Sequence, residues 1–145
     1  MVAEDEEDAI LTAIEILSFL PDHTLAEAVT LSSGDPADRA CKALTDIVPA
    51  DSNIPYDIRK VVTEVVDEGR FLELFSTYAE NIVIGFARLD GQSVGIVANQ
   101  PKVLAGCLDI DASVKAARFI RTCDIFNIPV VTFVDVPGFL PGTVQ

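Results

Sequence analysis

The sequence lacks the residue types that mark several classes of protein. It has no tryptophan, one histidine (His23) and three widely spaced cysteines, Cys41, Cys107 and Cys123. No two cysteines form a CxxC pair, so neither a zinc cluster nor a disulfide framework is indicated. His23 has no serine or cysteine nearby in a recognisable nucleophile setting, which favours a solvated loop histidine over a catalytic one.

Basic residues are scarce, and the excess of acid lies in the first half. The 145 residues include 10 Lys and Arg against 23 Asp and Glu, for a formal net charge of −13. Residues 1–75 hold 17 of the acids and 5 of the bases, whereas residues 76–145 are nearly neutral. The excess of acid argues against nucleic acid as a partner. It predicts that the acidic half is solvated surface or a docking face for a basic partner, and that the second half holds most of the core.

Long hydrophobic runs are also absent. No apolar run approaches the roughly 20 residues that span a bilayer, and the first residues are acidic where a signal peptide would carry positive charge. We therefore expect no membrane span, and a location in the cytoplasm, or in the mitochondrial matrix if the source is eukaryotic. What is present is globular composition, with 50% hydrophobic residues, in a length that suits one ordinary domain.

The first half predicts two helices joined by an irregular segment. Residues 4–20 form an amphipathic pattern with acids in the first turns, where the helix dipole favours them, and Pro21 ends it. The apolar face is broad, so we expect it to pack against another element. Residues 22–56 lose this periodicity and predict a long connection. A second helix is expected to begin at Asp57 as its N-cap and to end at Gly69.

The second half predicts strands and one helix. Residues 71–75 favour a short extended piece. Residues 82–89 and 92–98 are rich in Ile, Val and Phe, and the Asp90-Gly91 pair between them predicts an antiparallel hairpin. Residues 109 to about 126 predict a helix. Its expected buried face consists of Val114, Ala116, Ala117, Phe119, Ile120, Cys123 and Phe126.

The end of the chain combines an apolar segment with a loop of glycine and proline. Residues 130–134 predict a buried strand, because apolar and β-branched side chains fill both of its faces. After it come Pro137, Gly138, Pro141 and Gly142. The glycines leave main-chain N–H groups open to a ligand and the prolines stiffen the loop, which suits backbone donors for a developing negative charge. Spacing alone favours a simpler explanation, two tight turns.

The order strand, strand, helix, strand and glycine loop resembles one turn of the ββα superhelix of the crotonase superfamily. The resemblance becomes specific in FARLDGQSVGIVANQP and in GCLDIDASVKAARFIRTCDIFNIPVVTFVDVPGFLPGTVQ. These segments are similar to the carboxyltransferase (β) subunit of biotin-dependent acyl-CoA carboxylases, the propionyl-CoA and methylmalonyl-CoA group with its transcarboxylase and decarboxylase relatives. The similarity extends upstream through DPADR and IVPADSNIPYDIRKVVTEVVDEGRFLEL, so it covers essentially the whole chain.

This resemblance implies a partial α/β fold of the crotonase-like (ClpP/crotonase) type. Residues 1–21 correspond to the closing helix of a first half, residues 22–56 to an interdomain linker, and residues 57–145 to the opening part of the C-terminal carboxyltransferase half. The glycine pair of the first half and the later Gly-Gly-Ala loop of the second have no counterpart here. We therefore expect a fragment that does not catalyse the family reaction alone.

The reaction implied by the resemblance moves a carboxyl group from carboxybiotin to the α carbon of propionyl-CoA or a similar short acyl-CoA. Biotin would be carried by a partner, a biotin carboxylase or biotin carrier subunit, and the subunits would form a homo-oligomer, a hexamer by family. Two alternatives stay open: a non-catalytic assembly module, and a subunit of a methylmalonyl-CoA decarboxylase or transcarboxylase. A crotonase-fold protease or hydratase would need a Ser–His pair or paired carboxylates at the loop, and the sequence shows neither.

The resemblance assigns the glycine loop to biotin. Pro137, Gly138 and Phe139 are expected to contact the cofactor, and Gly138, Phe139 and Gly142 to provide catalytic main-chain N–H groups or a wall. Phe139 can equally be a hydrophobic lid or a core anchor. Asp135, at the end of the predicted strand, is expected to hold the loop by accepting its N–H groups.

The helix predicted over residues 109–126 offers a weaker candidate for substrate binding. Lys115, Arg118 and Arg121 recur every three residues and can meet the phosphates of CoA, although a solvated or subunit-facing helix side is the favoured explanation. Asp109 and Asp111 have the chemistry of general bases, but helix caps explain them better. No metal is expected.

Overall fold

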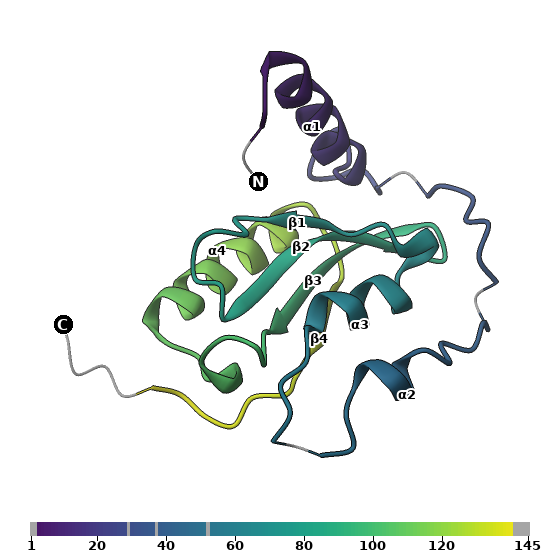
Figure 1. Cartoon of the computed structure of the whole chain (residues 1–145). Helices are drawn as coiled ribbons and strands as arrows, with labels where there is room; N and C mark the ends of the chain where they lie inside the picture. Colours follow the sequence, from purple (N-terminus) through teal and green to yellow (C-terminus); the bar gives the residue numbers. More distant parts are fainter. Residues whose placement is uncertain (1–2, 29, 37, 52, 141–145) are drawn as a thin grey trace.

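The computed structural model describes residues 3–28, 30–36, 38–51 and 53–140 (Figure 1). Gly142 of the predicted site therefore lies outside the described residues. Short 3₁₀ turns cover Asp67–Gly69 and Leu104–Gly106. The remaining elements are α1 (Glu6–Phe19), α2 (Leu44–Ile47), α3 (Ile58–Val65), β1 (Leu72–Leu74), β2 (Ile82–Leu89), β3 (Gln92–Asn99), α4 (Ile110–Ile125) and β4 (Val130–Phe133).

The four strands form one sheet in the order β1-β2-β3-β4. The first three are antiparallel, and β4 lies parallel to β3 with α4 as the crossover between them. The β2–β3 hairpin turns at Asp90 and Gly91, whose φ angles of 51° and 76° suit the tight turn that matches strand twist. The predicted hairpin and the helix that follows it are confirmed.

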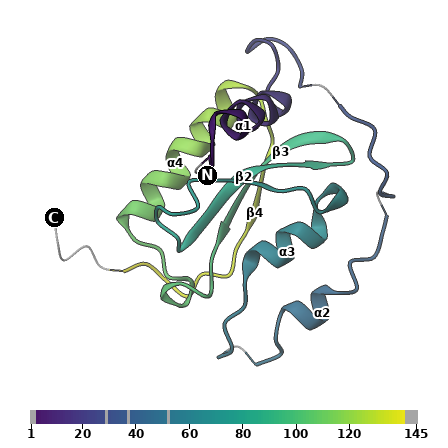
Figure 2. The same cartoon turned by 45° about the horizontal axis from the view of Figure 1, so that its top comes forward.

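Helices cover both faces of the sheet, as the two views show (Figures 1 and 2). On one face, α4 and the end of α1 pack against side chains such as Ile84 and Phe86. On the other face, α3 packs against Val83 and Ile96. Because both faces are covered, β2 and β3 are buried along most of their length, which explains their nearly continuous apolar sequence.

The strand predicted over residues 130–134 forms as β4, which ends at Phe133, but neither it nor Val134 is buried. Val130 is 37% exposed and Val134 is 72% exposed. In the described part of the chain β4 is the last strand of the sheet, so no strand pairs with its outer edge. The prediction of a strand is confirmed and the prediction of its burial is wrong for this structure.

Helices α1 and α3, the two predicted in the first half of the chain, differ in part from the prediction. Helix α1 docks mainly through its end, where the Phe19 ring stacks on Phe86 at 5.6 Å between centroids and lies 4.2 Å from the guanidinium carbon of Arg88. Its broad apolar face is largely exposed, at Ile10, Leu11, Ile14 and Leu17. Helix α3 begins after Asp57 as predicted but ends at Val65, and Gly69 closes the 3₁₀ turn that follows.

Some apolar residues of α4 that the sequence periodicity placed in the core are exposed. Its buried positions are Ala112, Lys115, Phe119 and Cys123, a stripe at helical spacing. Val114, Ala117 and Ile120 were expected in the core but are exposed.

Lys115 lies in the interior instead of on the predicted basic face. Its Nζ donates to the carbonyl oxygens of Tyr78 and Ile82 at 2.7 and 2.8 Å, and to that of Ala79 at 3.3 Å. Burial lowers the pKa of Lys115, while the carboxylate of Glu73 acts in the opposite direction. The ammonium group thus holds together the turn before β2 by donating to three of its carbonyl oxygens.

Gly95 provides a test of how closely α4 packs on the sheet. A Cβ at this position would lie 2.5 Å from the Cys123 sulfur and 3.2 Å from the Phe119 ring. Gly95→Ala should therefore lower the free energy of unfolding by ~1–3 kcal/mol, because α4 must move. Chemical denaturation of Gly95→Ala, Cys123→Ala and the double variant measures this, and removal of the sulfur should recover part of the loss. Strictly additive effects would contradict the contact.

Candidate functional site

The loop of residues 134–140 follows β4 and is held by the segment before α4. The N–H of Leu108 donates to the carbonyl oxygen of Gly138 at 3.1 Å, and the N–H of Leu140 donates to the carbonyl oxygen of Leu108 at 2.8 Å. The two hydrogen bonds form a short parallel bridge between Leu108 and Phe139. The loop is therefore fixed to the body of the domain on both sides of Phe139.

Two main-chain donors of the loop have no partner in the described part of the chain. Neither the N–H of Gly138 nor that of Phe139 donates to a described residue. A Cβ built on Gly138 meets no atom within 4 Å, and the Phe139 side chain is 71% exposed. Phe139 is thus no anchor of the core described here, whereas the roles of donor and lid fit its position. The arrangement can accept a ligand oxygen that carries negative charge.

Asn99, the last residue of β3, holds the start of the loop. Its side chain is buried, with 5% of the residue exposed. The amide oxygen accepts the N–H of Asp135 at 2.7 Å, and the amide nitrogen donates to the carbonyl oxygen of Asp135. One side chain therefore satisfies both main-chain groups of Asp135.

Gly106 makes the close approach of these groups feasible. Its φ of +81° lies in the left-handed region, which glycine adopts without the strain of a side chain. A Cβ there would lie 2.9 Å from the Asn99 amide nitrogen and 3.0 Å from the Asp135 carbonyl oxygen. Any other residue would push against the junction between Asn99 and the loop.

Tyr56 ties the segment before α3 to the same loop. Its hydroxyl donates to the carboxylate of Asp135 at 2.8 Å. Burial, this hydrogen bond and the charge of Asp135 raise the pKa of Tyr56 to about 12, so the hydroxyl stays protonated as a donor at neutral pH. The Asp135 carboxylate was expected to accept N–H groups of the loop; among described residues it accepts from Tyr56 instead, because the side chain points toward residues 48–56.

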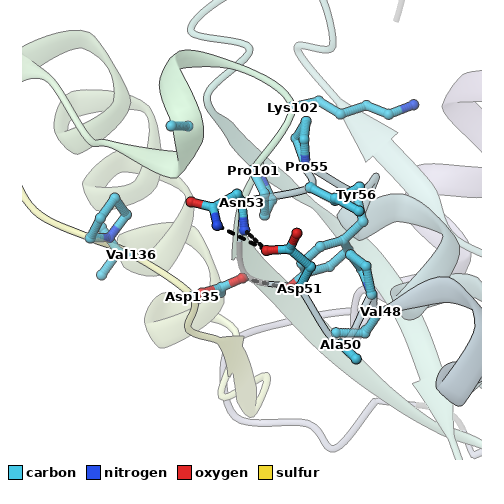
Figure 3. A pocket seen from close by; sticks show the side chains of 14 residues that line it. Val48, Ala50, Asp51, Asn53, Pro55, Tyr56, Pro101, Lys102, Asp135 and Val136 are labelled. Carbon is cyan, nitrogen blue, oxygen red and sulfur yellow. Dashed lines mark hydrogen bonds between the residues drawn. The ribbon is translucent and has the colours of Figure 1, made fainter.

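The loop separates two hollows. The first, of about 600 Å³, lies between residues 48–56 and the start of the loop (Figure 3), and Tyr56, Lys102, Asp135 and Pro137 are among its lining residues. The second, of about 420 Å³, lies beside the start of α4 and is lined in part by Leu108, Phe139 and Leu140. Pro137 and Phe139, both predicted to contact biotin, thus border different hollows.

The three predicted basic residues are not brought to the loop. Lys115 is buried, and none of the three lines either hollow beside the loop. Arg118 lines a third, apolar hollow of about 360 Å³ between α1 and α4. Arg121 is exposed on α4, so contact with CoA phosphates stays a prediction for the two arginines.

The two acids at the start of α4 differ in role. Asp109 is the predicted N-cap, and its carboxylate accepts the N–H of Ala112 at 2.8 Å. Asp111 lies in the first turn and accepts the hydroxyl of Tyr78 at 3.0 Å, so it is not a cap. Both carboxylates thus make hydrogen bonds that stabilise the structure around the start of α4.

Other kinds of site find no support within the described ranges. No group of three or more His, Cys, Asp and Glu side chains is placed to hold a metal ion there. Among those same residues, no helix combines the length and apolar character needed to cross a membrane.

Sequence analysis missed Asn99, Gly106 and Tyr56. Asn99 and Asp135 are 36 residues apart, and Tyr56 and Asp135 are 79 apart, so no local pattern connects them. The only available signal was the Asn-Gln-Pro break after the strand, which marks a strand end and not a partner.

Comparison with known proteins gives a matching family model and relatives whose names belong to acyl-CoA carboxylases and decarboxylases. The family model described as the carboxyl transferase domain matches residues 1–145. The methylmalonyl-CoA decarboxylase subunit alpha of Veillonella parvula is 54% identical over 143 residues, covering 99% of this chain and 28% of that protein. The biotin-dependent acetyl-/propionyl-coenzyme A carboxylase beta5 subunit of Mycobacterium tuberculosis is 51% identical over 150 residues, covering 99% of this chain and 27% of that protein.

A solved structure of transcarboxylase 12S, with hydrolysed methylmalonyl-coenzyme A bound, superposes with a TM-score of 0.93 at 52% identity. The match covers 99% of this chain and 28% of that chain, so the present chain spans little more than a quarter of these relatives. The expected partial α/β fold of the crotonase-like type is confirmed by this likeness. The chain belongs to the carboxyl transferase domain family.

Proposed function

We propose that this chain is part of a biotin-dependent acyl-CoA carboxyltransferase, and that the loop of residues 134–140 forms part of the biotin side of its active site. The observation that carries the proposal is that neither the N–H of Gly138 nor that of Phe139 donates to a described residue. A Cβ on Gly138 would meet no atom within 4 Å, and Asn99 and Leu108 hold the loop on either side. Preorganised donors of this kind stabilise negative charge without reorganisation during the reaction.

The proposed contacts fit the chemistry of the cofactor. Bound carboxybiotin would supply the carboxyl group, and negative charge would develop on the ureido oxygen as that group leaves. The main-chain N–H groups of Gly138 and Phe139 would donate to this oxygen, each lowering the barrier by roughly 3 kcal/mol. Pro137 would keep the loop stiff, and the exposed Phe139 ring would cover the cofactor and exclude water. Gly142 is proposed as a further donor from the sequence alone.

The proposed acceptor is propionyl-CoA or a similar short acyl-CoA. The support is chemical likeness: the related proteins are named for propionyl-CoA or methylmalonyl-CoA, and one solved relative holds the latter in hydrolysed form. A hexamer is proposed because that relative is described as one. Biotin would be carried by a separate carboxylase or carrier subunit, in the cytoplasm or, for a eukaryotic source, the mitochondrial matrix.

Two other functions are candidates. A subunit of a methylmalonyl-CoA decarboxylase or transcarboxylase is favoured by the relatives that bear those names at 54% and 52% identity. A non-catalytic assembly module is the other alternative, and it differs from both enzymes in giving no carboxyl exchange.

The first experiment is to sequence the DNA on both sides of this segment, express the whole reading frame, and assay exchange of the carboxyl group between methylmalonyl-CoA and free biotin. Exchange that depends on both substrates would support the carboxyltransferase. A whole frame that assembles with a carboxyltransferase but gives no exchange would support the assembly module. Comparison of propionyl-CoA and methylmalonyl-CoA turnover with a carrier subunit would then distinguish carboxylase from decarboxylase.

A further inference from the structure

We propose that Asn99 is a positioning residue for the proposed biotin-facing donors of the loop. The inference rests on the proposed function for its catalytic consequence, but its physical content is independent: the side chain of Asn99 sets the orientation of the Asp135 peptide groups and so the course of residues 135–140. Asn99 itself touches neither Gly138 nor Phe139 through a hydrogen bond in the structure.

The base from which Asn99 acts is rigid. It is the last residue of β3, directly opposite Ile82 in the antiparallel pair with β2. Both neighbours in the chain are buried as well. Ala98 pairs with Val83, and the N–H of Gln100 donates to the Asn81 carbonyl oxygen at 2.9 Å. A side chain mounted on such a strand end keeps its direction.

The chemistry requires an amide. The carboxamide places an acceptor and a donor side by side, matching the N–H and the carbonyl oxygen of one residue, Asp135. An aspartate of the same size would keep the acceptor for the N–H but turn a second acceptor toward the carbonyl oxygen. A glutamine would need room that Gly106 does not leave, because even a Cβ at that glycine would lie 2.9 Å from the amide nitrogen.

The loop is also held by Leu108, and this second set of hydrogen bonds explains why the contact between Asn99 and Asp135 affects the donors. Leu108 holds Gly138 and Leu140 through two main-chain hydrogen bonds, so the loop is pinned at Asp135 and again three residues later. With Asn99 in place, the peptides that carry the Gly138 and Phe139 N–H groups lie between fixed points. Without it, only the Leu108 bridge and the exposed Tyr56 contact would restrain them.

The test is Asn99→Asp in the protein expressed from the whole reading frame. We expect kcat/KM for free biotin to fall by ~10–100-fold, because donors displaced by about 1 Å lose much of their effect. The KM for the acyl-CoA should stay within about twofold of its original value, since the loop is proposed to lie on the biotin side of the site. Hydrogen exchange of the peptide that covers residues 134–140, measured by mass spectrometry, should become faster.

The matched control is Asn127→Asp, the same chemical change at an exposed residue whose amide donates to Thr24. It should leave both kinetic constants and the exchange of the loop unchanged. If Asn99→Asp does not assemble, Asn99→Ser is measured in the same way. A fall in activity matched by an equal fall in the fraction of folded protein, measured by circular dichroism, would overturn the positioning role, as would unchanged kinetics.

Failure of the proposed function gives a different result. If the unmodified protein shows no exchange with biotin, the carboxyltransferase proposal fails, and hydrogen exchange alone judges Asn99. Faster exchange of the loop in Asn99→Asp, but not in Asn127→Asp, would still support its hold on the loop. Unchanged exchange would overturn it whatever the activity.

Discussion

Replacing Gly138 with valine is expected to lower kcat/KM for biotin by ~100-fold or more in the full-length subunit, with little change in its unfolding temperature. The branched side chain would occupy the open space beside Gly138 that the cofactor is proposed to use, and loss of one oxyanion donor typically costs a factor of this size. The fold should tolerate it, because a Cβ at Gly138 meets no atom within 4 Å. Steady-state exchange assays and thermal unfolding measure the two effects.

Gly34→Val is the matched control for that substitution. Gly34 also has open space around a built Cβ, with only the Glu68 carboxylate 3.7 Å away, and it lies far from the loop in the sequence. The control should keep full activity. Normal turnover by Gly138→Val would remove Gly138 from the proposed site, and a large fall in its unfolding temperature would show that the valine acts on the fold and not on the cofactor.

The elements predicted correctly are those with a local cause. Asp90-Gly91 determines its hairpin through the φ angles of two adjacent residues, and Asp109 caps α4 through a hydrogen bond to a residue three positions later. Such signals lie within a few residues and survive whatever surrounds them.

The errors have a common physical origin: each depends on which distant part of the chain packs against the residue, and local sequence does not show this. Val130 is as apolar as a central strand residue, but β4 lies at the edge of the described sheet, so composition overstated its burial. Lys115 was assigned to solvent because it is charged. It belongs to the buried stripe of α4, because the carbonyl groups of the turn before β2, more than 30 residues away in sequence, accept its hydrogen bonds. Asn99 was overlooked because its partner is remote in sequence. Positions whose role depends on long-range polar contacts are therefore the ones that required the structure.

Lys115 gives the largest expected effect on stability. Lys115→Met should lower the free energy of unfolding by ~2–4 kcal/mol, because it leaves the part-buried carbonyl oxygen of Tyr78 and the buried one of Ile82 without their charged donor. Methionine fills a similar volume, and loss of the buried ammonium removes a desolvation cost, so the effect should be smaller than that of a full cavity. Urea unfolding of the expressed protein measures it.

Arg121→Met, an exposed position on the same helix, serves as the control and should change stability by no more than ~0.5 kcal/mol. Equal effects of the two substitutions would mean that the desolvation of the ammonium cancels its three hydrogen bonds, and Lys115 would then contribute nothing net to the fold. A clear excess for Lys115→Met would instead show that a cation placed on the buried stripe of α4 stabilises the turn from which β2 begins. Because β3 pairs with β2 along its whole length and ends in Asn99, that turn lies at the base of the scaffold that carries the proposed biotin loop.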